Sequence, residues 1–152
     1  MNNNNSKNHY TEAEKNEYKQ KRREIREQCF IVLFEMTFTD DSYQDILDNA
    51  VESRTIVADE YMLSILDYYS QNKEKIDSLI SSNLKNGWTI ERLSRAALSI
   101  LRLAISEMNS SKIAGEIVIN ESVEIAKKYT TPKDASFING VLGSIVRNKN
   151  KS

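Results

Sequence analysis

Apolar residues recur at every third or fourth position between Trp88 and Met108, and this pattern constrains the fold more than any other part of the sequence. It is the spacing of one face of an α-helix, and the alanines within it allow a neighbouring helix to approach closely. Thr89 stands where an N-cap residue is expected, and a polar break follows at residues 109–111. We therefore predict a central helix that is surrounded by other helices. Its buried face would consist of Leu93, Ala96, Ala97, Ile100, Leu101, Ala104, Ile105 and Met108.

Similar patterns on both sides of this stretch predict an all-α fold with about seven helices in two small packed bundles. The first helix is expected to start at Thr11, because Thr11 and Glu14 fit a capping box. The last is expected to follow an N-cap at Thr131 with proline at its first position. Gly140 and Gly143 interrupt this last helix, and we interpret them as points of close packing. Apart from the central and the last helix, the expected helices cover about residues 11–37, 46–51, 57–69, 76–84 and 112–129.

The chain of 152 residues has the length of one domain. Residues 1–10 form a polar, asparagine-rich tract that we predict to be disordered. Residues 11–149 would form a single all-helical domain, with sub-bundles over about 11–84 and 88–149. The division follows a helix stop around residues 83–87, which ends in glycine.

Composition excludes several classes of protein. Four glycines and one proline are too few for the tight turns of an all-β fold. A single cysteine rules out an internal disulfide and a zinc site built on several cysteines. No apolar run approaches the roughly 18 residues that span a bilayer, and no secretory signal is evident, so we expect a cytoplasmic protein with no membrane partner. The net charge of −1 implies that any nucleic-acid site is local.

Residue types that carry out catalysis are scarce. The only histidine, His9, lies in the polar tail, and Cys29 falls on an apolar helix face, where we expect it to be part of the core. Glycine-rich phosphate loops and the common catalytic motifs are absent. We therefore expect no enzyme activity, no metal and no cofactor. Asn120, a polar residue on a mostly apolar helix, is expected to make an internal hydrogen bond.

Five basic residues share one face of the first helix, ahead of its apolar half. Few acidic residues accompany them, and arginine predominates near the core, where a planar guanidinium can bind phosphate oxygens through two hydrogen bonds. This pattern favours a surface for RNA or DNA, and a solvated helix face is the alternative. The residues, called the basic stripe below, are Lys15, Lys19, Arg22, Arg23 and Arg26.

An aromatic residue near the start of the last helix is a second indication of nucleic-acid binding. Phe137 stands one turn into this helix, close in sequence to Lys133. An aromatic side chain beside a cation could stack an unpaired base. A position in the core is the alternative for Phe137.

Four blocks of residues follow one another along the chain: Arg22-Arg23-x-x-Arg26-Glu27 with Leu33-Phe34, Ile100-Leu101-Arg102-Leu103-Ala104-x-x-Glu107-Met108, Ile119-Asn120-Glu121-x-Val123-Glu124-Ile125-Ala126-Lys127 and Phe137-Ile138-Asn139-Gly140-Val141-Leu142. In this order they resemble the NusB family of transcription antitermination factors. Together they extend over roughly residues 22–147, and their combination is far more specific than any one of them. Three sites depart from the family pattern: Ala97-Leu98 replaces an acidic–basic pair, Ser136 a lysine and Ala114 a proline.

The resemblance implies an all-helical protein that binds the boxA element of nascent RNA as a heterodimer with NusE, a small-subunit ribosomal protein. Such a complex would act beside the RNA polymerase elongation complex and favour read-through, notably in ribosomal RNA operons. Residues 1–20 have no counterpart in the resemblance, and Lys19 is assigned to RNA only through the basic stripe. The residues implied in RNA binding are Arg22, Arg23, Arg26, Lys133, Asp134 and Phe137, and the residue implied in partner binding is Phe34.

Two other interpretations of the same sequence remain open. One is a helical protein-interaction scaffold, a homodimer when free, whose basic stripe only aids solubility. The other is a stand-alone relic of the helical domain that accompanies some RNA cytosine methyltransferases. Binding of boxA RNA would favour an RNA-binding factor over the scaffold. Methyl transfer by the purified protein would support the methyltransferase relic.

Overall fold

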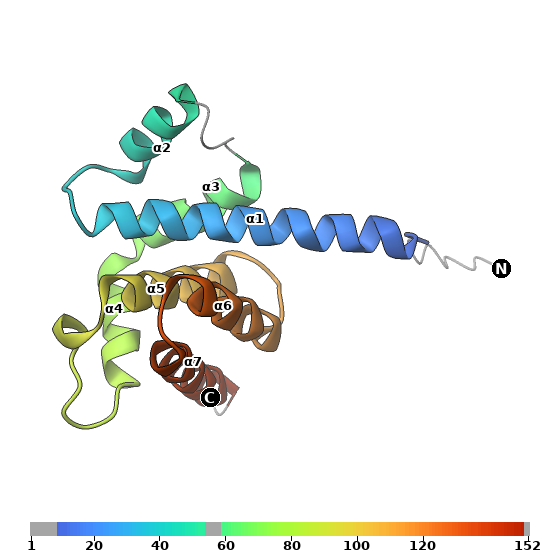
Figure 1. Cartoon of the computed structure of the whole chain (residues 1–152). Coiled ribbons are helices and arrows are strands. Elements are labelled where there is room, and N and C mark those ends of the chain that lie inside the picture. Colours follow the sequence, from blue (N-terminus) through green and yellow to red (C-terminus); the bar gives the residue numbers. More distant parts are fainter. Residues whose placement is uncertain (1–8, 54–58, 151–152) are drawn as a thin grey trace.

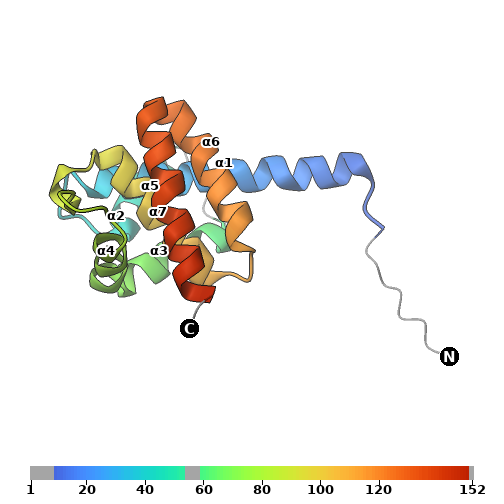
Figure 2. The same ribbon diagram turned by 90° about the horizontal axis from the view of Figure 1, so that it is seen from below.

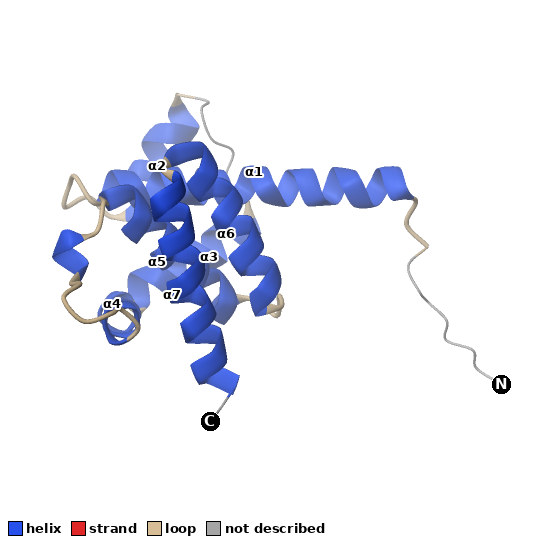
Figure 3. Cartoon of the chain, turned by 60° about the horizontal axis from the view of Figure 1, so that its bottom comes forward, coloured by secondary structure: helices blue, strands red, loops and turns tan. Residues whose placement is uncertain are grey.

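α5 (Arg95–Ser110) is the central helix of the structure, in contact with α1, α3, α4, α6 and α7. The computed structural model describes residues 9–53 and 59–150, and within these ranges the chain forms seven α-helices, one short 3₁₀-helix and no strand (Figure 1, Figure 3). The predicted all-α class is therefore confirmed. The other elements are α1 (Glu12–Met36), α2 (Tyr43–Glu52), α3 (Glu60–Gln71), α4 (Lys73–Ser82), η1 (Ile90–Arg92), α6 (Gly115–Tyr129) and α7 (Pro132–Asn150).

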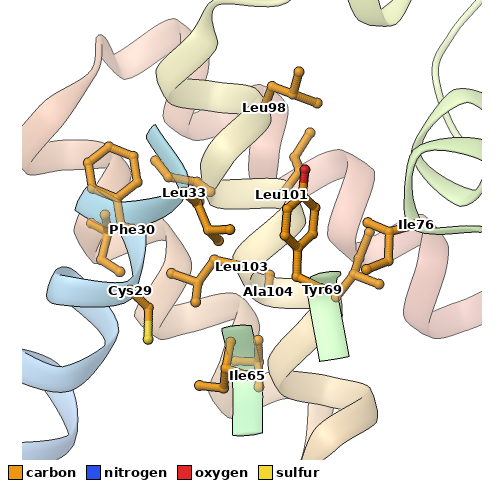
Figure 4. Packing of buried hydrophobic residues seen from close by; sticks show 14 of the residues in the cluster. Cys29, Phe30, Leu33, Ile65, Tyr69, Ile76, Leu98, Leu101, Leu103 and Ala104 are labelled. Carbon is orange, nitrogen blue, oxygen red and sulfur yellow. The ribbon is translucent and has the colours of Figure 1, made fainter. Parts of the chain in front are cut away.

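The apolar face of α5 is buried by its neighbours, as its spacing predicts. Ile100, Leu101 and Ala104 have no exposed surface and belong to the same core as side chains of α1 and α3 (Figure 4). Cys29 of α1 lies in this core, which confirms the position predicted for it. Burial raises the pKa of its thiol above the ordinary value, so the thiol stays protonated and unreactive.

α5 begins at Arg95, later than predicted. Thr89 precedes η1 and makes no side-chain capping bond. The N-cap of α5 is Ser94, whose hydroxyl accepts a hydrogen bond of 3.0 Å from the amide of Ala97. Leu93 and Ser94 have extended backbone conformations, which separate η1 from α5. The predicted start was wrong because two hydroxyl residues precede the apolar run, and the nearer one caps it.

α1 has two halves with different surroundings. It starts as predicted, since the hydroxyl of Thr11 accepts a hydrogen bond of 3.1 Å from the amide of Glu14. From Ile25 onwards it packs against α2, α3 and α5. Residues 12–21, called the arm below, are exposed on all sides and project beyond the other helices (Figure 2). The arm is polar all round and has no hydrophobic face to bury.

α6 and α7 pack against each other, and one glycine allows their close approach. A Cβ atom on Gly115 would lie 3.0 Å from Cγ2 of Val146 in α7, so even an added methyl group would require the Val146 side chain to shift. The start of α7 is the predicted one. The hydroxyl of Thr131 accepts a hydrogen bond of 3.1 Å from the amide of Asp134 and so caps the helix.

The two glycines within α7 do not make the close helix contacts predicted for them. A Cβ atom on Gly140 would have no other atom within 4 Å, and one on Gly143 would meet only the flexible side chain of Arg147. The prediction was wrong because helical spacing alone does not distinguish a glycine at a helix contact from a glycine facing open space.

Replacing Gly140 with alanine is therefore expected to stabilise the protein by about 1 kcal/mol, the difference in helix propensity between these residues. Urea unfolding followed by circular dichroism measures the change. Gly115→Ala is the matched control, and it should fail to stabilise because its Cβ meets Val146. A loss of stability in Gly140→Ala would contradict the open surroundings of this position.

Two predictions about organisation remain predictions. The tail at residues 1–10 lies outside the described residues except for its last two positions. The division into sub-bundles at about residues 84–88 is likewise untested, and one cluster of buried side chains includes members from α1 to α7. No helix in the described ranges is both long and apolar enough to cross a membrane.

Candidate nucleic-acid interface

Arg26, the member of the basic stripe nearest the core, is buried. Only 5% of its surface is exposed, and its Nε lies 2.8 and 2.9 Å from the two carboxylate oxygens of Glu107 in α5. Burial by itself would lower the pKa of this guanidinium, but the hydrogen bonds and the charge of Glu107 outweigh burial and raise the pKa. The prediction that Arg26 is open to RNA is wrong, because neighbouring helices cover its side chain.

The carboxylate of Glu107 also holds a tyrosine of α3. The hydroxyl of Tyr61 donates a hydrogen bond to it. Burial, and then the hydrogen bond and charge of Glu107, raise the pKa of Tyr61 to about 12. The guanidinium carbon of Arg22 lies 3.4 Å from the centre of the Tyr61 ring, within the range of a cation–π interaction. Glu107 therefore positions both Arg26 and the ring on which Arg22 rests.

Arg22 is held by aromatic groups and has no carboxylate partner among the described residues. Its Nε donates a hydrogen bond of 3.3 Å to the hydroxyl of Tyr18. Lys19, which is exposed, also makes no ion pair in the described part of the chain. Arg23 differs, since its Nε lies 2.9 Å from a carboxylate oxygen of Glu121 in α6, although its side chain is 44% exposed. Lys19 and Arg22 are thus available to an anion, and Arg23 only in competition with Glu121.

A groove of about 1180 Å³ lies between α1, α6 and α7, beside these cations. α1 contributes basic side chains to it, α6 contributes apolar, amide and charged groups, and α7 contributes small apolar, hydroxyl and amide groups. Asn120 is exposed in this groove and makes no side-chain hydrogen bond within the described residues, so the predicted internal hydrogen bond is wrong. Nowhere in the described ranges could a cluster of acidic, histidine or cysteine side chains hold a metal ion. The residues that line the groove include Tyr18, Lys19, Arg22, Ile117, Asn120 and Asn139.

The residues predicted at the start of α7 lie outside the groove. Asp134 accepts a hydrogen bond of 3.2 Å from the hydroxyl of Ser94 at the start of α5. Phe137 packs on Trp88, with ring centroids 5.6 Å apart. Lys133 is exposed. Lys133, Asp134 and Phe137 do not line the groove, whereas their neighbours Pro132, Ala135 and Ser136 do. The structure therefore does not bring Lys133, Asp134 and Phe137 together with the arginines. Their role in RNA binding stays a prediction.

A row of aromatic side chains extends from the end of α6 to the turn that follows α1. The ring centroids are 4.9 Å apart for Tyr129 and Phe30, 5.9 Å for Phe30 and Phe34, and 5.1 Å for Phe34 and Phe38. Phe34, the predicted partner-binding residue, is half-buried, whereas Phe38 is 61% exposed. The guanidinium carbon of Arg95 lies 4.4 Å from the Phe38 ring centroid. Phe38 was not among the residues predicted for this surface, although its spacing of four from Phe34 indicates a shared helix face.

Comparisons with known sequences agree on one family. The model of the NusB family matches residues 23–147. The transcription antitermination protein NusB of Listeria welshimeri serovar 6b is 39% identical over 126 residues, which cover 82% of this chain and 95% of that protein. The transcription antitermination protein NusB of Clostridium botulinum (strain Kyoto) is 39% identical over 142 residues, covering 82% of this chain and 99% of that protein.

Solved structures share the fold. A chain in the crystal structure of antitermination factors NusB and NusE in complex with dsRNA is 30% identical with a TM-score of 0.73, covering 84% of this chain and 96% of that chain. T. maritima NusB is 32% identical with a TM-score of 0.72, covering 83% of this chain and 90% of that chain. The sequence match and the shared fold lead to one conclusion: the chain belongs to the NusB family of transcription antitermination proteins, which are not enzymes.

Proposed function

We propose that this protein binds boxA RNA as a heterodimer with NusE and supports read-through by RNA polymerase, notably in ribosomal RNA operons. The observation that carries the proposal is the groove beside Arg22, a guanidinium that lies on an aromatic ring and is not neutralised by a carboxylate. A similar chain forms part of a solved complex of NusB and NusE with dsRNA.

Phosphate contacts would come from the exposed part of the basic stripe. Lys19 and Arg22 have no carboxylate to displace, and Arg23 would exchange Glu121 for a phosphate. Such contacts supply affinity that depends on salt, whereas the bases supply discrimination. Arg26 acts indirectly: its ion pair with Glu107 fixes α1 against α5 and so positions the arginines that precede it. With a net charge of −1, the protein would bind RNA weakly alone.

The aromatic row is the surface that we assign to NusE. Phe38, the more exposed of its two ends, is an apolar side chain that a partner can cover, and Phe34 packs beneath it. Arg95 lies over Phe38. The residue before it, Ser94, donates a hydrogen bond to Asp134 of α7. A partner on this row would therefore be close to the start of α7. It could extend the RNA surface there and increase affinity.

Filter binding of a boxA oligonucleotide, with and without purified NusE and over a range of salt concentrations, tests the proposal. The double variant Arg22→Ala/Arg23→Ala is expected to bind roughly 10- to 30-fold more weakly at 0.1 M salt, with a slope of log affinity against log salt lower by about 0.7 per lost contact. Each arginine that contacts a phosphate releases counterions, and this is the origin of both effects.

The matched control is Lys75→Ala/Lys85→Ala, which removes two exposed cations that do not line the groove. It should bind like the unaltered protein. Equal affinity and salt slope for the arginine variant would contradict the assigned surface. Failure of the unaltered protein to bind RNA, even with NusE, would favour the scaffold interpretation. Size-exclusion chromatography of the same preparations tests the predicted homodimer of the free protein.

A further inference from the structure

We propose that the arm of α1 completes the groove as a binding site for an unpaired nucleotide, with the ring of Tyr18 stacking the base. The proposal rests on the proposed function, because it concerns the same RNA. It concerns residues outside the family match, which begins at residue 23, whereas Tyr18, Lys19 and Arg22 precede it.

Tyr18 presents its ring at the mouth of the groove. The residue is 62% exposed and lines the groove together with Lys19 and Arg22. The guanidinium carbon of Arg22 lies 5.3 Å from the centre of the Tyr18 ring, and 3.4 Å from that of Tyr61. An exposed ring beside cations is the usual combination in proteins that bind single-stranded nucleic acid, because the ring stacks a base while the cations bind its phosphates.

The opposite side of the groove has groups suited to the rest of a nucleotide. Ile117 of α6 is an apolar side chain, 49% exposed, that can cover the face of a base. Asn120 of α6 and Asn139 of α7 are exposed amides, and within the described part of the chain neither side chain makes a hydrogen bond. Such amides can donate to and accept from the edge of a base. The groove therefore offers a stacking ring, an apolar surface and free amides within one space.

Charge and shape favour a single RNA strand as the occupant. Five cations and two acidic residues line the groove. Three of the cations are paired with carboxylates, namely Arg23 with Glu121, Arg26 with Glu107 and Lys127 with Glu124. Lys19 and Arg22 make no ion pair within the described part of the chain, and they suit the phosphates of a polyanion. A duplex would present phosphates to these cations, but its stacked bases could not reach Tyr18, Ile117 or the amides. An unpaired strand satisfies both the cations and the apolar groups.

Fluorescence titration of single-stranded boxA RNA containing 2-aminopurine tests this site, because 2-aminopurine is quenched when it stacks on a ring. The unaltered protein is expected to quench it at one or more positions. Tyr18→Leu, which keeps an apolar side chain with high helix propensity, should abolish this quenching and weaken binding about tenfold. Tyr18→Phe keeps the ring and should stay within about threefold of the unaltered protein. Binding of the same RNA as a duplex should hardly change.

Tyr10→Leu is the matched control, because Tyr10 is also an exposed tyrosine near the start of α1 but does not line the groove. A second control repeats Tyr18→Leu in an Arg22→Ala background, where a persisting loss shows that Tyr18 acts through its own ring and not by orienting Arg22. Unchanged quenching and affinity in Tyr18→Leu, or equal losses for single-stranded and duplex RNA, would overturn the inference while leaving the proposed function intact. Failure of the unaltered protein to bind RNA would overturn both.

Discussion

Replacing Arg26 with methionine is expected to lower the free energy of unfolding by about 3–5 kcal/mol. The change leaves the carboxylate of Glu107 buried in α5, with the hydroxyl of Tyr61 as a partner but without its counter-charge. A buried charge that loses its partner is far more costly than a surface charge, because water cannot solvate it. Urea unfolding followed by circular dichroism measures the loss by linear extrapolation.

The matched control for this prediction removes both charges, in Arg26→Met/Glu107→Met. Two apolar side chains of similar volume should recover most of the loss, with about 1 kcal/mol still missing because the Tyr61 hydroxyl has lost its acceptor. If Arg26→Met alone cost less than about 1 kcal/mol, the pair would be accessible to water, contrary to the burial described above.

Replacing Phe38 with alanine is expected to weaken NusE binding by about 30-fold or more. Exposed aromatic side chains that become buried at the centre of an interface contribute the most to affinity. Phe38 contacts Phe34 and Arg95 but is 61% exposed in the free protein, so the free energy of unfolding should fall by only about 1 kcal/mol or less. Isothermal titration calorimetry with purified NusE measures the affinity, and urea unfolding measures the stability.

Leu63→Ala is the matched control, since Leu63 of α3 is also an exposed apolar residue but lies outside the aromatic row. It should bind NusE like the unaltered protein. Phe34→Ala is expected to lower both NusE affinity and stability, because Phe34 packs against Phe30 and Phe38. Normal NusE binding by Phe38→Ala would show that the partner uses a different face of the protein.

Much of the fold was predictable because it depends on local patterns. The caps at Thr11 and Thr131 are set by hydrogen bonds to residues three positions away, and both form as predicted. The burial of α5 follows from the period of its apolar residues. The same reasoning failed where two caps compete, as at Thr89 and Ser94, because the sequence pattern does not rank two adequate cap residues.

The site was only partly predictable, because helical periodicity gives the direction of a side chain but not the extent of the neighbouring helix. The spacing places Arg22, Arg23 and Arg26 near one face of α1. Of the three, only Arg26 is buried, where it pairs with Glu107, a residue 81 positions away in the sequence. Patterns within α1 contain no information about such a distant partner.

The start of α7 shows the same limit. Ser136 lines the groove, whereas the next residue, Phe137, packs on Trp88. Neighbouring residues on a helix point in directions about a quarter-turn apart, so a short motif at the end of a helix can contribute to two surfaces. The sequence motif does not say how α7 is placed against α5 and α6. It therefore could not show whether Lys133, Asp134 and Phe137 lie beside the arginines of α1.

The ion pair between α1 and α5 also sets an order of events during synthesis. A chain made from its N-terminus carries Arg26 out of the ribosome well before Glu107 has been added, since 81 residues separate them. In that interval α2 and α3 can already pack against the apolar half of α1, whereas α5 cannot. α1 therefore reaches its final environment only after the second half of the domain has been made.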